Sequence, residues 1–194
     1  MSHRILYLVR HGQYQLKQRD QGELTAMGEE QARITAEALH DIPFNMIHVS
    51  TVRRAVQTAE IVAESFPGIQ IQSSELLREC VPSMPKRLAA LFAMRSPAYD
   101  PQEMTLCAHQ FDRAFAYFFT PPPEGINSYD LLICHGNIIR YFVTAALRIN
   151  AEVWASLLIH NCGITRVMID TDGDMFLISH NDIGHLPPDL RTDN

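Results

Sequence analysis

The sequence lacks any long apolar run and any excess of basic charge. The apolar run near its start, residues 5–9, is shorter than the roughly 18 residues of a membrane span and shorter than the core of a secretory signal. Lys and Arg total 16 against 22 Asp and Glu, so the formal net charge is −6. A nucleic-acid-binding surface carries the opposite sign. We therefore expect neither a membrane partner nor a nucleic-acid partner.

Cysteine is also scarce, and the cysteines form no Cys-x-x-Cys pair. There are four of them, namely Cys80, Cys107, Cys134 and Cys162. Their spacing fits neither a zinc site nor a disulfide framework. Three lie within or beside apolar runs, where buried free thiols are common. The sequence therefore predicts reduced core cysteines in a cytoplasmic protein. Most of the histidines show no metal-ligand spacing, so no metal and no cofactor is expected.

What the sequence does have is the composition of a folded globular domain. Hydrophobic residues make up 46% and charged residues 20% of 194 residues, which excludes a disordered chain. At roughly 150 residues per domain, this length corresponds to one domain. No internal repeat or linker interrupts it, so we expect a single domain over residues 1–194.

Short apolar runs alternate with amphipathic segments along the chain. Strands are predicted over residues 4–9, 45–49 and 131–134. A further strand, the third in chain order, is predicted to begin at residues 69–71. Helices are predicted over residues 25–39, with Thr25 as the N-cap, and over residues 51–66, with Ser50 or Thr51 as the N-cap. Further helices are predicted over residues 86–95, 103–119 and 137–148 and around Trp154. Residues 164–169 and 175–179 flank a turn and predict a β-hairpin. This order predicts an α/β fold, a three-layer α/β/α sandwich whose central sheet is mainly parallel, with an antiparallel C-terminal hairpin.

Reactive side chains follow three of the predicted strands. The first strand ends in Arg10 and His11, the second leads to Arg54, and the strand at 131–134 ends in His135 and Gly136. Ligands bind beyond the carboxyl ends of strands in such sheets, where helix N-termini also favour an anion. Arginine supplies permanently charged planar donors, and histidine can act as a nucleophile or a proton donor. The pattern predicts a phosphoryl-binding site.

Four motifs in this order resemble those of the histidine phosphatase superfamily, the phosphoglycerate mutase-like proteins. They read Leu8-Val9-Arg10-His11-Gly12, Arg54-Ala55-Val56-Gln57-Thr58-Ala59, Leu77-Arg78-Glu79 and His135-Gly136. Within the family, the sequence is most similar to the mitochondrial branch of serine/threonine protein phosphatases. It differs from that branch at Gly12 and Gly136, where the branch has Ser and Ala.

The resemblance implies a role for each candidate catalytic residue. An unprotonated ring nitrogen of His11 would attack phosphorus, and its other nitrogen would donate to a fixed acceptor such as a nearby backbone carbonyl. Arg10 and Arg54 would clamp the phosphoryl oxygens. His135 and Gly136 would bind the phosphate, and Glu79 would act as the general acid and then activate water. The resemblance in the tail makes His185 a weaker candidate for the pocket rim.

The leading hypothesis is thus a metal-independent phosphatase with a phosphohistidine intermediate on His11 and phosphorylated Ser/Thr proteins as substrates. A small-metabolite phosphatase and a phosphohistidine-protein phosphatase are the enzymatic alternatives, and a phosphate-recognising module without turnover is the non-enzymatic one. The segment 82–128 is the one expected to separate protein from metabolite substrates. We expect a cytoplasmic protein, with mitochondria as the alternative compartment, although nothing in the sequence matches that branch's membrane-anchored extension. A homodimer is one option for its assembly.

Overall fold

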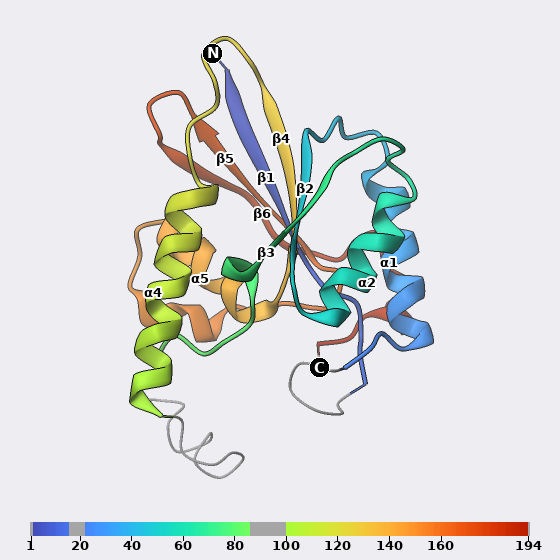
Figure 1. The fold of residues 1–194 in the computed structure, drawn as a ribbon, viewed down its shortest axis with the longest axis horizontal. Helices are drawn as coiled ribbons and strands as arrows, with labels where there is room; N and C mark the ends of the chain where they lie inside the picture. The colour runs from blue at the N-terminus through green and yellow to red at the C-terminus, as the bar shows by residue number, and fades with distance from the viewer. Residues whose placement is uncertain (1, 16–21, 86–99, 194) are drawn as a thin grey trace.

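The computed structural model describes residues 2–15, 22–85 and 100–193, which build one six-stranded sheet in the order β3-β2-β4-β1-β5-β6 (Figure 1). The strands are β1 (His3–Arg10), β2 (Met46–Ser50), β3 (Ile71–Ser74), β4 (Ser128–Cys134), β5 (Ile164–Asp170) and β6 (Met175–Asp182). The pairs β1–β4, β2–β4 and β2–β3 are parallel, whereas β1–β5 and β5–β6 are antiparallel. The predicted mainly parallel sheet with an antiparallel C-terminal hairpin is confirmed.

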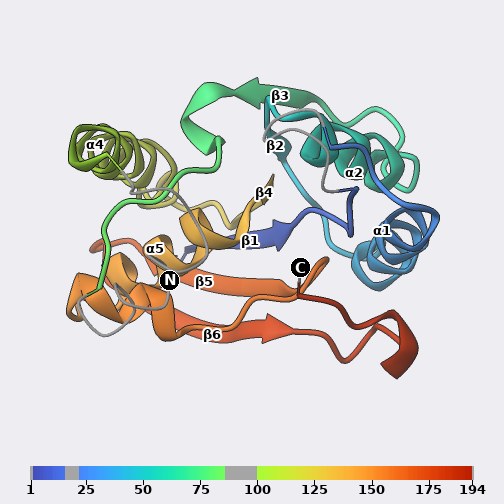
Figure 2. The ribbon, with the colours of Figure 1, turned by 90° about the horizontal axis from the view of Figure 1, so that it is seen from below.

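Helices cover both faces of this sheet and complete three layers (Figure 2). They are α1 (Ala26–Leu39) and α2 (Arg53–Ala63) on one face, and α4 (Pro101–Phe118) and α5 (Gly136–Ala146) on the other, with short 3-10 helices η1 (Glu75–Leu77), η2 (Ala151–Ser156) and η3 (Pro188–Leu190). Alternate residues of a strand point to opposite faces. Leu6 and Leu8 of β1 accordingly pack with α4 and α5, whereas Tyr7 and Val9 pack with α1 and α2. The central strands are therefore buried on both sides.

The N-terminus of α1 has the predicted N-cap residue, whereas that of α2 does not. Thr25 caps α1 as predicted, because its Oγ1 accepts a hydrogen bond from the Gly28 N–H at 3.0 Å. The cap predicted for the next helix is wrong, since α2 follows Val52 and has no side-chain cap. It also ends at Ala63 rather than near residue 66. The helix predicted over 86–95 lies outside the described residues.

The prediction of four reduced cysteines is wrong. Cys80 and Cys107 form a disulfide with a Cα–Cα distance of 5.8 Å, whereas Cys134 and Cys162 are free and buried. The bonded pair joins the segment after η1 to α4 across 27 residues of sequence, so only the tertiary fold brings the two sulfurs together. The spacing rules used for short cysteine motifs do not detect such a pair. Among the described residues, no helix has the length and apolar character needed to cross a membrane.

Candidate active site

The candidate catalytic residues meet at the carboxyl ends of β1, β2 and β4, at the lower end of the sheet in Figure 1. His11 follows β1 directly, and its backbone N–H donates to the carbonyl of Cys134, the last residue of β4, at 3.0 Å. His135 follows Cys134 and lies immediately before α5. Because β1 and β4 are parallel neighbours in register from Arg4 onward, the two histidines leave the sheet side by side.

The His11 ring is held in one tautomer by its two hydrogen bonds. Nδ1 donates to the carbonyl of Gly12 at 2.8 Å, which is the kind of backbone acceptor predicted from the sequence. Nε2 accepts from Nε of Arg54 at 2.9 Å, so Nε2 carries the lone pair. Burial lowers the pKa of His11 well below 6.5, and the nearby His135, Arg10 and Arg54 lower it further. The ring is therefore neutral, and Nε2 is the ring atom that can act as a nucleophile.

Arg54 joins the two histidines into one cluster. Its second contact runs from Nη2 to Nδ1 of His135 at 3.2 Å, and the ring centroids of His11 and His135 are 5.1 Å apart. Nε2 of His135 lies 2.8 Å from the hydroxyl of Ser50 at the end of β2. Burial, followed by Arg54 and Arg10, lowers the pKa of His135 well below 6.5. Both imidazoles are thus neutral beside permanently charged guanidinium groups, an arrangement suited to a dianionic phosphoryl group.

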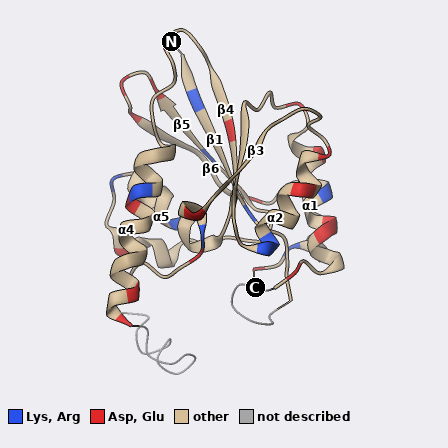
Figure 3. Ribbon diagram, viewed as in Figure 1, with Lys and Arg blue, Asp and Glu red and all other residues tan. Residues whose placement is uncertain are grey.

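Arg10 enters the cluster from β1 and is fixed by the C-terminal part of the chain. Its Nη1 donates to the carbonyls of Ile159 at 2.7 Å and Asp193 at 3.2 Å. Gly136 opens α5 beside it, and a Cβ at Gly136 would lie 3.7 Å from Nε of Arg10, an ordinary contact. In Figure 3 the ribbon is blue at the start of α2, where Arg53 and Arg54 lie, at the same end of the sheet.

Glu79 lies near these cations but in a different environment. Its Oε2 accepts from the backbone N–H of Asn137 in the first turn of α5 at 3.2 Å. Its Oε1 is shielded from solvent and has no hydrogen-bond partner among the described residues. Burial raises the pKa of Glu79, although the Asn137 N–H and then Arg10, Arg54 and Arg140 act in the opposite direction. A carboxyl group held above its ordinary pKa is suited to donate a proton.

The structure therefore brings together all six residues predicted from the sequence, and it adds others that sequence reasoning missed. Tyr14 lies with its ring 4.5 Å from the Arg54 guanidinium and edge-on to His11. Asn161 donates to the His11 carbonyl at 3.1 Å. Thr58 accepts from the Gly12 N–H at 3.1 Å. Thr58 was within reach of sequence reasoning, since it belongs to the Arg-Ala-x-x-Thr motif. Tyr14 and Asn161 carry no local signal.

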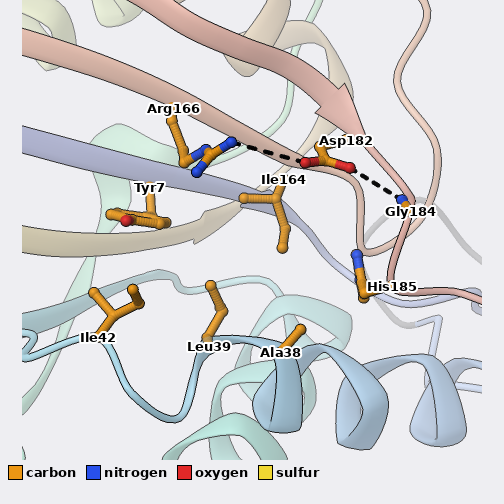
Figure 4. A pocket seen from close by; sticks show the side chains of 9 residues that line it. All are labelled: Tyr7, Ala38, Leu39, Ile42, Ile164, Arg166, Asp182, Gly184 and His185. Atoms are coloured by element: carbon orange, nitrogen blue, oxygen red, sulfur yellow. Dashed lines mark hydrogen bonds and ion pairs between the residues drawn. The ribbon is translucent and has the colours of Figure 1, made fainter.

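His185 does not join this cluster. It lines a separate cavity of about 320 Å³ between α1 and the β5–β6 hairpin, with Tyr7, Leu39 and Ile164 around it (Figure 4). Its Nε2 lies 3.0 Å from the hydroxyl of Thr35. None of the six predicted site residues lines that cavity. Within residues 2–15, 22–85 and 100–193, no group of three or more His, Cys, Asp or Glu side chains could hold a metal ion.

Comparisons with known proteins identify the family of the chain. The model of the histidine phosphatase superfamily (branch 1) matches residues 6–90. The chain is 36% identical to the mitochondrial serine/threonine-protein phosphatase Pgam5 of Caenorhabditis briggsae, over 95% of this chain and 65% of that protein. It is 32% identical to the protein of the same name from Xenopus tropicalis, over 96% of this chain and 67% of that one. The chain thus spans about two thirds of the length of these curated relatives.

A solved structure extends the similarity to the fold. The phosphoglycerate mutase of Plasmodium falciparum superposes with a TM-score of 0.67 and 27% identity, covering 97% of this chain and 96% of that one. Each motif that carries the similarity in sequence also contributes a side chain to the cluster around His11. On these grounds, the chain belongs to the histidine phosphatase superfamily.

Proposed function

We propose that this protein is a phosphomonoesterase that works through a phosphohistidine on His11. The observation that carries the proposal is the fixed His11 ring, with Nδ1 bound to the Gly12 carbonyl and the Nε2 lone pair facing Arg54. Nε2 forms a bond to phosphorus while the bond to the leaving oxygen breaks, and Glu79 gives that oxygen a proton. The phosphoryl oxygens are held by Arg10, Arg54 and His135 and by the first turn of α5 at Gly136. These groups stabilise the oxygens as the charge on the oxygens redistributes.

The second half of the cycle uses Glu79 in the opposite direction. The Glu79 carboxylate takes a proton from water as the water oxygen attacks phosphorus, and the N–P bond breaks with its electron pair returning to Nε2. The products are inorganic phosphate, neutral His11 and protonated Glu79, so the enzyme returns to its starting state. The cycle needs no metal, because the guanidinium groups of Arg10 and Arg54 supply the positive charge.

Phosphorylated Ser/Thr proteins are the proposed substrates. The two curated relatives carry the name serine/threonine-protein phosphatase, which supports this class over a small metabolite. We propose that the whole chain, residues 1–194, forms one domain. The relatives are also named mitochondrial, and the disulfide removes the cysteine argument for the cytoplasm. These two observations support a mitochondrial over a cytoplasmic location. The homodimer stays a prediction.

A substrate panel in the presence of a metal chelator tests this function. We expect phosphoserine and phosphothreonine peptides to be hydrolysed with a higher kcat/KM than small phosphate esters, and we expect the chelator to leave the rates unchanged. A preference for a small ester would assign the protein to the metabolite phosphatases. Phosphate binding without turnover on every substrate, including an aryl phosphate, would reduce it to a recognition module.

The pH dependence of kcat/KM should reflect the shifted pKa values of His11 and Glu79. Turnover needs unprotonated His11, and its lowered pKa keeps it unprotonated well below pH 6.5. Turnover of an alkyl phosphate also needs protonated Glu79, and its raised pKa keeps it protonated above the ordinary carboxyl range. We expect kcat/KM to fall on the acidic side through His11 and on the alkaline side through Glu79. The check is the profile of Glu79→Gln, which should lose the alkaline fall due to Glu79; an unchanged profile would contradict the assignment.

A further inference from the structure

Glu79 is bonded through the backbone to Cys80, whose sulfur is joined to Cys107 of α4. Cys107 is only 4% exposed, and one turn later Phe111 is fully buried in the core. Helix α4 is therefore anchored to the body of the protein. The disulfide ties the segment that carries the general acid to this helix.

A second contact on the same face of α4 holds the same segment. Gln110 lies three residues after Cys107, and residues three apart on a helix are neighbours on its surface. The Gln110 side-chain amide donates to the carbonyls of Leu76 at 3.1 Å and Arg78 at 3.0 Å. The backbone on both sides of Glu79 is thus fastened to α4, by hydrogen bonds before it and by a covalent bond after it.

Helix α5 holds this segment from the other direction. The Asn137 side-chain amide donates to the carbonyl of Cys80 at 3.0 Å, while the Asn137 backbone N–H donates to Oε2 of Glu79 at 3.2 Å. Both helices therefore hold Cys80. Its sulfur is bonded to Cys107 of α4, and its carbonyl accepts a hydrogen bond from Asn137 of α5. Moving Cys80 would move the Glu79 carboxyl group relative to the phosphoryl site.

We propose that the Cys80–Cys107 disulfide positions Glu79 for proton transfer, and that a dithiol reductant therefore lowers the rate of the acid-dependent step. This inference rests on the proposed function. Neither cysteine touches the reacting atoms, so both are positioning residues. In the reduction, a thiolate of the reductant attacks one sulfur of the pair and releases the other cysteine as a thiolate. The reductant's second thiolate then attacks the reductant's own sulfur in the mixed disulfide and releases the first cysteine. Two electrons and two protons pass to the protein, leaving two thiols, and the reductant becomes a cyclic disulfide.

The other two cysteines do not interfere with the thiol–disulfide exchange. Cys134 and Cys162 are fully buried, and burial raises the pKa of both thiols, that of Cys162 to about 12. Buried thiols of this kind stay protonated and exchange slowly. Cys80, by contrast, is only half-buried, so a small dithiol can reach the bond.

We expect reduction to lower kcat for phosphoserine by about tenfold, because displacing a catalytic group by about 1 Å costs up to 10²-fold and Gln110 and Asn137 still hold the segment. An aryl phosphate with an acidic leaving group needs less protonation, so its phosphorylation rate should fall less. The affinity for inorganic phosphate should stay unchanged, since the histidines and arginines remain in place.

The experiment compares oxidised and dithiothreitol-reduced protein, with the thiol count fixed by alkylation and mass spectrometry. Reoxidation should restore the rate of phosphoserine hydrolysis. The double variant Cys80→Ser/Cys107→Ser should have the same rate as the reduced enzyme, and adding the reductant should not change that rate. Equal phosphoserine rates before and after reduction would overturn the proposal, as would equal losses in the rate of phosphoenzyme formation for the alkyl and the aryl substrate. Because reduction and reoxidation use the wild-type chain, the test survives poor folding of the double variant. A failure of the proposed function itself would look different, since the oxidised protein would then turn over no substrate.

Discussion

His11→Ala should abolish turnover, with kcat falling by at least about 10⁴-fold, the order of loss when a covalent nucleophile is removed. Alanine has no side-chain nitrogen that can bond to phosphorus, and the His11 ring is the group that lies between the Gly12 carbonyl and Nε of Arg54 among the described contacts. The measurement is rapid quenching of a reaction with labelled substrate. The wild-type protein should yield an acid-labile, base-stable phosphoenzyme, and the variant should yield none.

The control for this experiment is His40→Ala. His40 lies at the end of α1, outside the four motifs, with its side chain 61% exposed and bound to the Glu37 carbonyl. Its removal should leave the rate and the phosphoenzyme unchanged, which separates loss of the nucleophile from loss of any histidine. Undiminished activity in a folded His11→Ala protein would show that phosphoryl transfer goes directly to water or to another side chain.

Glu79→Gln should lower the turnover of an alkyl phosphate such as phosphoserine by about 10²–10⁴, the usual contribution of a positioned general acid. The amide keeps the shape of the side chain and can still accept from the Asn137 N–H. Like the protonated carboxyl group, the amide carries no negative charge near Arg10 and Arg54, so phosphate affinity should be retained. An aryl phosphate with an acidic leaving group should form the phosphoenzyme at nearly the normal rate. Hydrolysis of phospho-His11 then limits its turnover if Glu79 also activates the water.

A pre-steady-state comparison of phosphoenzyme formation with both substrates measures this difference. The matched control is Glu75→Gln, four residues earlier in η1, whose side chain is 71% exposed and pairs with Arg78 at 3.4 Å. That variant should behave as the wild type with both substrates. Equal losses for the two leaving groups in Glu79→Gln would mean that another carboxylate is the acid. Glu103, exposed in the first turn of α4, would then be the next residue to test.

Local sequence signals were sufficient for most of the fold. The run 4–9 predicts β1 because a strand buried on both faces needs continuous apolar residues, and both faces of β1 are indeed covered. Thr25 predicts the start of α1 because a hydroxyl can bind a free N–H of the first turn. The cap of α2 could not be predicted in this way. The Ser50 hydroxyl also lies 2.8 Å from Nε2 of His135, a partner 85 residues away, and a tertiary contact of this kind competes with local capping.

The candidate catalytic residues were likewise visible in the sequence because their positions follow from topology. Parallel strands place their carboxyl ends at one edge of the sheet, so motifs after β1, β2 and β4 had to converge. Their protonation states did not follow from the sequence. The lowered pKa of His11 and the raised pKa of Glu79 both arise chiefly from burial, which is a property of the packed protein.

The sequence by itself determined the family, the α/β sandwich and the candidate residues, because all three depend on local motifs and their order along the chain. Only the tertiary structure decided the contact of Arg54 with Nε2 of His11, the hydrogen bond from Asn137 to Glu79 and the pairing of Cys80 with Cys107. Each of these depends on distances between residues far apart in sequence or on exclusion of water, and no local pattern encodes either. The disulfide illustrates the point, since the spacing of its cysteines predicted free thiols and the packing of α4 against the Glu79 segment brings the two sulfurs into bonding distance.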